Sequence, residues 1–134
     1  MFSPDDKYVA LVKKNRGPAN MAGKLNAIGG HIEKNETPLQ AQQREFLEET
    51  GVDYEGWVKF AVLCGPNNGG WTVHFFATYS TKVFDVKQKE DESIGVYAVG
   101  LLDIHRKNAK SQLADSHGIV NHSRTGIVRI VHSD

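Results

Sequence analysis

Three glutamates stand at a spacing that suits metal chemistry. Glu45, Glu48 and Glu49 occupy positions i, i+3 and i+4, so they share one face if this segment is a helix. Neighbouring carboxylates on a helix repel one another by roughly 0.2–0.5 kcal/mol per pair. Hard oxygen ligands of this kind suit Mg²⁺ or Mn²⁺, which would relieve the repulsion and also bind substrate phosphates. A solvated acidic helix face is the alternative interpretation.

The sequence around these glutamates predicts a helix over residues 38–50. Thr37 can cap its N-terminus, Pro38 takes the favoured first position, and Gln40 completes a capping box. Gly51 can end the helix in a left-handed conformation. A core-facing side opposite the glutamates is predicted for Leu39, Phe46, Leu47 and Thr50.

Strands are expected on both sides of this helix. Apolar segments predict strands at residues 8–12, 57–64, 71–80 and 94–99, with a short one at 26–33 that a glycine pair interrupts. Turn residues at 66–70 predict that the second and third of these form an antiparallel hairpin. The pattern after residue 101 is ambiguous, and a C-terminal helix interrupted near Gly126 fits it. We therefore expect a mixed α/β sandwich.

The glutamates belong to a longer pattern that begins at a glycine. Gly30 is followed after five residues by Glu36, and after seven more by the run from Arg44 to Val52. This pattern resembles the signature of the Nudix hydrolase family, Gly-x5-Glu-x7-Arg-Glu-U-x-Glu-Glu-x-Gly-U, where U is bulky and aliphatic. The one departure is Phe46, an aromatic residue at a U position.

The resemblance implies a fold, an activity and a cofactor. The fold would be a Nudix-type α/β/α sandwich with a mixed β-sheet, formed by one domain over residues 1–134. The activity would be hydrolysis of a nucleoside diphosphate linked to another moiety, dependent on Mg²⁺ or Mn²⁺. Similar domains usually begin with another strand, so the N-terminal strand is expected to be shortened or missing.

The resemblance also assigns roles to the residues of the pattern. Glu45, Glu48 and Glu49 would bind the metal, together with the carbonyl of Gly29. Arg44 would orient a glutamate by ion pairing, with an ordinary helix salt bridge as the alternative.

Two further glutamates complete the assignment. Glu36 would brace the loop before the helix, or else be a solvated turn residue. A later loop often adds an acidic ligand in this family, and Glu92 is preferred to Glu90 because it directly precedes a predicted strand. Glu45 is the first choice for the general base and Glu92 the second.

Substrate-binding residues are expected in the loops and the hairpin. Arg16 and Lys24 carry charges suited to phosphates, and Phe75 is the preferred residue for stacking on a base, beside Trp71 and Phe76. The favoured substrate is a small ribo- or deoxyribonucleoside triphosphate, including oxidised forms, cleaved to a monophosphate and pyrophosphate.

Three alternatives remain at this stage. Pro66 lies near the position where the ADP-ribose subgroup of the family carries a proline, whereas the tyrosine typical of the dinucleoside polyphosphate subgroup is not found. A non-catalytic module that binds nucleotide or RNA is the alternative of another class. Such modules typically lose glutamates of the signature, and this chain keeps them.

Composition narrows the classes of partner and location. The 134 residues carry 16 basic and 16 acidic side chains, so no stable nucleic-acid partner is expected. The single cysteine, Cys64, excludes an intrachain disulfide. No apolar run reaches the ~18–20 residues of a membrane span, and no signal peptide is recognised, so we expect a cytoplasmic protein. A sheet edge left open by the short N-terminus suggests a homodimer.

Overall fold

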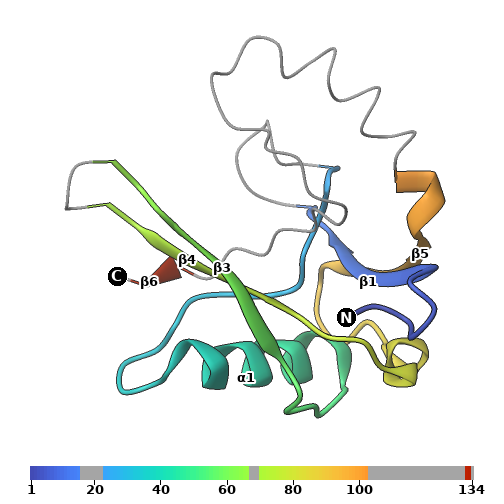
Figure 1. Cartoon of the computed structure of the whole chain (residues 1–134), viewed down its shortest axis with the longest axis horizontal. Coiled ribbons are helices and arrows are strands. Elements are labelled where there is room, and N and C mark those ends of the chain that lie inside the picture. The colour runs from blue at the N-terminus through green and yellow to red at the C-terminus, as the bar shows by residue number, and fades with distance from the viewer. Residues whose placement is uncertain (16–22, 67–69, 103–131, 134) are drawn as a thin grey trace, which may run out of the picture.

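The computed structural model describes residues 1–15, 23–66, 70–102 and 132–133 (Figure 1). Pairs of strands alternate with helices along the chain, in keeping with the predicted mixed α/β class. In order, they are β1 (Tyr8–Lys13), β2 (Leu25–Asn26), α1 (Pro38–Thr50), β3 (Val58–Cys64), β4 (Thr72–Ala77), the 3₁₀ helix η1 (Thr81–Asp85), β5 (Ser93–Ala98) and β6 (His132–Ser133).

The strands form two small sheets, whose orders are β2-β1-β5 and β3-β4-β6. All four strand pairs are antiparallel. Figure 1 shows α1 lying beneath the β3–β4 hairpin, with the segment between β2 and α1 running past both. The hairpin and the strands near residues 8–12 and 94–99 are therefore confirmed. The strand predicted at 26–33 is mostly wrong, because only Leu25–Asn26 pairs with β1.

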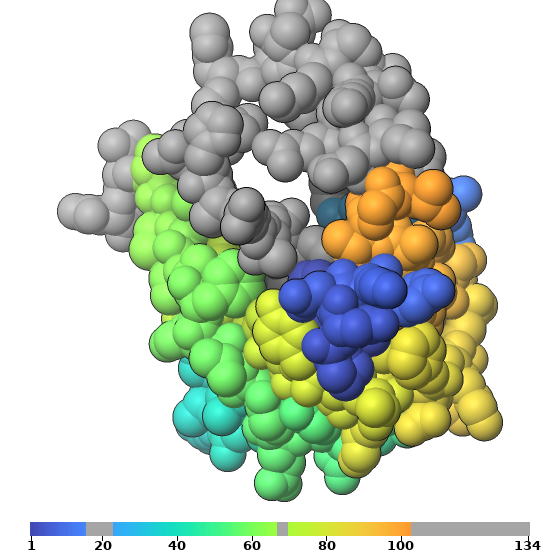
Figure 2. Space-filling model, turned by 45° about the vertical axis from the view of Figure 1, so that its right-hand side comes forward, coloured from blue at the N-terminus to red at the C-terminus, as the bar shows by residue number. Residues whose placement is uncertain are grey.

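The N-terminal residues join the two sheets. Phe2 pairs with Val9 on one side and with Tyr79 on the other, the second pair being parallel. Its amide donates to the carbonyl of Thr78 at 2.8 Å, and its own carbonyl accepts from the amide of Ser80 at 2.9 Å. Figure 2 shows this blue segment seated between the yellow-green residues of β4 and the orange residues after β5. Phe2 thus covers part of the edge that suggested a homodimer, which stays a prediction.

Strand β1 is buried on both faces, and each face supports a separate apolar cluster. Ala10 and Val12 belong to a cluster with Phe46 of α1, whereas Val9 and Leu11 pack against a second cluster around Phe2. The alternation follows from the two-residue period of a strand. In the first cluster Phe46 also meets Trp57 edge to face, with ring centroids 4.8 Å apart. Helix α1 is therefore fixed to the sheet by apolar packing at its centre.

The ends of α1 are as predicted. The Thr37 hydroxyl accepts from the Gln40 amide at 3.2 Å, and the Gln40 side chain accepts from the Thr37 amide at 2.9 Å. Gly51 is left-handed, with φ 74°, and its amide donates to the carbonyl of Leu47. Both ends of the helix thus satisfy backbone groups that would otherwise lack partners.

The buried side of α1 differs from the prediction. Leu39 and Leu47 are exposed, whereas Gln42 and Glu49 are buried at 1% and 8% relative exposure. Gln42 and Glu49 lie about 40° and 60° from Phe46 around the helix, and Leu47 lies about 100° away in the other direction. The helix is therefore turned so that its glutamate side borders the core, and Leu39 at its first turn stays exposed.

Two remaining expectations concern the ends of the chain and the membrane. The predicted C-terminal helix falls mostly on residues 103–131, outside the described residues. Among the described residues, no helix is long and apolar enough to cross a bilayer.

Candidate active site

The guanidinium of Arg44 lies at the centre of the acidic residues. Its Nε and Nη2 donate to the two carboxylate oxygens of Glu36, at 2.8 and 3.1 Å. Its Nη1 donates to Glu45 at 2.8 Å and to Glu48 at 3.0 Å. One planar cation thus orients three carboxylates, because the guanidinium presents several donors in a fixed geometry. The expected role of Arg44 in orienting a glutamate agrees with these contacts.

The same network fixes the loop before α1. Nη2 of Arg44 also donates to the carbonyl of His31 at 2.9 Å, and Glu36 accepts from the Glu33 amide at 2.9 Å. Glu36 is therefore a brace rather than a solvated turn residue, since only 13% of its side chain is exposed. The hydrogen bond from Arg44 holds the pKa of the Glu36 carboxyl below its usual range, and Glu36 in turn raises the pKa of Arg44.

Gly30 leaves room for the carboxylate of Glu45. A Cβ built at Gly30 would overlap the carboxylate carbon and both oxygens of Glu45. A side chain at this position would therefore displace Glu45 from Arg44. The glycine at the start of the signature has a direct steric role here.

The three glutamates of α1 have different surroundings. The side chain of Glu45 is 16% exposed and that of Glu48 is 47% exposed, and Glu49 borders the core. The loop after η1 closes over the C-terminal end of α1, where the amides of Lys87 and Lys89 donate to the carbonyls of Thr50 and Glu49. This contact brings the loop of Glu90 and Glu92 to the same end of the helix as the acidic residues.

Glu92 is held by a cation that the sequence analysis did not select. The ammonium of Lys14 lies 2.6 Å from Oε2 of Glu92, and about a quarter of each side chain is exposed. Strand register explains the pair, because Lys13 is opposite Ser93 in the β1–β5 ladder and the next residues are Lys14 and Glu92. Sequence alone could not find Lys14, since the pair depends on which strands become neighbours.

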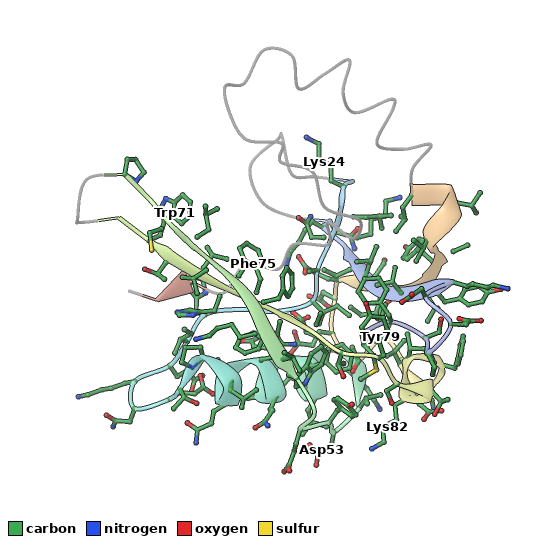
Figure 3. All side chains as sticks on the ribbon, in the orientation of Figure 1. Lys24, Asp53, Trp71, Phe75, Tyr79 and Lys82 are labelled. Carbon is green, nitrogen blue, oxygen red and sulfur yellow. The ribbon has the colours of Figure 1, made fainter. Side chains whose placement is uncertain are left out.

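The expected substrate-binding residues are distant from Arg44 in the sequence, and they differ from one another in solvent exposure. Lys24 is exposed beside β2, and Figure 3 shows its side chain on the side of the molecule away from α1. Phe75 in β4 is 4% exposed, with its ring centroid 6.1 Å from that of Phe60, whereas Trp71 is 41% exposed. Arg16 lies outside the described residues. The base-binding role of Phe75 stays a prediction.

A small cavity lies inside the core between α1 and the sheets. Its volume is about 20 Å³, and Gln42, Phe46, Trp57 and Phe76 are among the residues that line it. This volume holds about one water molecule and is too small for a nucleobase. The surface around Arg44 is therefore the better candidate for substrate.

The donor chemistry of this surface suits a divalent cation. Within residues 1–15, 23–66, 70–102 and 132–133, no three His, Cys, Asp or Glu side chains already gather as a metal site. Arg44 instead binds the carboxylates of Glu36, Glu45 and Glu48. The carboxylates along one side of α1 supply hard oxygen donors of the kind that Mg²⁺ binds.

Comparison with known families agrees with this chemistry. The model of the NUDIX domain matches residues 1–116, and the chain belongs to the Nudix family. No solved structure matches the chain. The mixed α and β structure with antiparallel sheets and few helices is consistent with the Nudix α/β/α sandwich, which confirms the predicted fold class.

Family membership defines the reaction class. The protein is a Nudix hydrolase that acts on pyrophosphate bonds, and its substrates are small nucleotide-type molecules derived from nucleoside diphosphates. Nudix hydrolases generally use divalent metal ions such as Mg²⁺.

We expect the substitution Glu36→Gln to lower the free energy of unfolding at neutral pH. In acid, the difference from wild type should disappear. The depressed pKa of Glu36 means that its contribution is present above the unfolded-state pKa and fades as the pH falls through the folded-state value. Urea unfolding should show a difference of about 1–3 kcal/mol at pH 7, shrinking below pH 4.5. The exposed substitution Glu55→Gln is the control, and a difference for Glu36→Gln that is independent of pH would contradict the ion-pair account.

We expect Gly30→Ala to reduce hydrolysis of pyrophosphate bonds with little loss of stability. The new methyl group meets the flexible end of Glu45, which can move away at low cost but then leaves Arg44. Misplacing such a group by about 1 Å can lower turnover on the order of 100-fold. Gly100→Ala is the matched control, because a Cβ there meets nothing within 4 Å. Full activity of Gly30→Ala would show that the position of Glu45 is unimportant.

Proposed function

We propose that the protein is a nucleoside triphosphate pyrophosphatase that releases a nucleoside monophosphate and pyrophosphate. The observation that carries the proposal is the arrangement of Glu36, Glu45 and Glu48 around Arg44, with the carboxylate of Glu45 packed against Gly30. The substrates would be ribo- or deoxyribonucleoside triphosphates, including oxidised forms.

The metal would be held on the glutamate side of α1. Glu45, Glu48 and Glu49 would bind Mg²⁺ or Mn²⁺, with the carbonyl of Gly29 as a further ligand. When bound, the cation would neutralise phosphate oxygens and lower the pKa of a coordinated water. Arg44 would keep Glu36 on the loop while the other carboxylates turn to the metal.

Glu45 is the proposed general base. Its side chain is largely sheltered, and its neighbours Gly30 and Arg44 restrict where its carboxylate can lie. Its carboxylate can accept a proton from the attacking water as a general base. The water oxygen forms the new bond to phosphorus, and the bond between the α-phosphate and the β-phosphate breaks. Glu92 is the second candidate for this role.

Triphosphates fit the basic residues of the described structure. Lys14 and Lys24 lie at the adjacent ends of β1 and β2, where the Lys14 amide donates to the Lys24 carbonyl at 3.0 Å. Lys24 is exposed and suits a phosphate, whereas the ammonium of Lys14 is already paired with Glu92. ADP-ribose and dinucleoside polyphosphates remain alternative substrates within the same mechanism. The full set of glutamates favours an enzyme over a binding module.

The proposal predicts which products form. The purified protein is incubated in ¹⁸O-labelled water with Mg²⁺ and a panel of nucleoside triphosphates, ADP-ribose and dinucleoside polyphosphates, and the products are analysed by mass spectrometry. We expect a monophosphate and pyrophosphate from a triphosphate, with one ¹⁸O atom, and no turnover after chelation.

Two variants show whether this site is responsible. Glu48→Gln should lower turnover by orders of magnitude and leave stability nearly unchanged, because Glu48 is half exposed and the change is isosteric. Glu55→Gln, also an exposed glutamate, should behave as wild type. The proposed triphosphate substrate would be contradicted if ADP-ribose gave ribose 5-phosphate and AMP while no triphosphate was hydrolysed. Hydrolysis of a pyrophosphate bond, the reaction of the family, would still hold. Undiminished turnover in Glu48→Gln would overturn the metal assignment.

A further inference from the structure

The end of β1 is tied to the loop before β5 by side chains that continue the strand ladder. After the last backbone pair, Lys13 with Ser93, the ammonium of Lys14 contacts Glu92 at 2.6 Å. One residue further on, the Asn15 side chain donates to the carbonyl of Asp91 at 3.2 Å. Glu92 therefore has a fixed position in this structure, and Lys14 supplies its charge partner.

The loop of Glu92 is tied by its backbone to the C-terminal end of α1. Glu92 follows Lys89 by three residues, and the Lys89 amide donates to the carbonyl of Glu49 at 3.2 Å. Consecutive Cα atoms are about 3.8 Å apart, so Glu92 is at most ~11 Å from Lys89 along the chain. This loop therefore lies beside the end of α1 that carries Glu49, one of the proposed metal ligands.

The charges of the described site residues divide into two groups. Arg44 satisfies Glu36, Glu45 and Glu48, whereas Lys14 satisfies Glu92. A divalent cation that takes Glu92 would share that carboxylate with the Lys14 ammonium. Two cations on one carboxylate repel each other, so each weakens the binding of the other.

We propose that Lys14 is a positioning residue that competes with the divalent cation for Glu92. Lys14 holds the carboxylate at the strand end when no metal is bound, and metal binding releases it from the ammonium. This inference rests on the proposed metal site, with Glu92 as the acidic ligand expected from the later loop, and it makes the affinity for metal depend on a lysine outside the Nudix signature.

The test measures metal affinity rather than activity. Free Mn²⁺ is determined by electron paramagnetic resonance during titration of the purified full chain. Lys14→Met should bind Mn²⁺ roughly two- to fivefold more tightly than wild type, the range expected for a partly exposed ion pair. Lys14→Arg, which keeps the charge, should stay near wild type. Lys13→Met is the matched control, because it removes the same charge from the adjacent, exposed residue.

A double variant separates competition from a general charge effect. Glu92→Gln should weaken Mn²⁺ binding, and adding Lys14→Met to it should give no further gain. Thermal unfolding of each variant without metal shows that the fold is intact. The inference is overturned if Lys14→Met leaves the affinity unchanged or weakens it, if Lys13→Met tightens it equally, or if the gain persists in the Glu92→Gln background. If the proposed metal site itself is wrong, the wild-type protein will bind no Mn²⁺, which distinguishes that outcome from failure of the inference about Lys14.

Discussion

The contacts of Arg44 determine the geometry of the whole acidic surface. Without a cation at this point, Glu36, Glu45 and Glu48 would repel one another beside a partly buried helix face. Arg44 instead binds all three and also the carbonyl of His31, so the loop before α1 and the helix itself form one unit. The capping box and the contact between Phe46 and Trp57 fix the helix that carries Arg44. Packing and electrostatics are thus linked through one side chain.

The fold brings two further segments to this surface. The loop that contains Gly30 passes so near Glu45 that a larger residue would displace the carboxylate. At the other end of α1, the backbone of residues 87–89 satisfies helix carbonyls and carries Glu92 toward the acidic residues. Both contacts are made by loop backbone that passes close to α1, so neither depends on a further helix or strand.

Local signals in the sequence were sufficient to predict the bounds of α1. Thr37, Gln40 and Gly51 predict both ends of the helix, and the spacing of Arg44 and the glutamates predicts the acidic surface. The buried side of the helix was predicted correctly for Phe46 and Thr50 and wrongly for Leu39 and Leu47. Hydrophobicity places Leu47 inside, whereas the packing of the loop and the sheet buries Gln42 and Glu49. Lys14 could not be predicted at all, since its partner depends on the register of β1 with β5. Contacts between distant segments are the part that local patterns do not contain.

The central claim is that the glutamate side of α1 binds the divalent cation used in hydrolysis. Crystals grown with Mn²⁺ and a non-hydrolysable triphosphate analogue would test it through anomalous scattering at the manganese absorption edge. The account predicts an anomalous peak bound by carboxylates of Glu45, Glu48 and Glu49, with Arg44 still paired to Glu36. A peak bound only by other residues, from protein whose hydrolysis requires Mn²⁺, would contradict it.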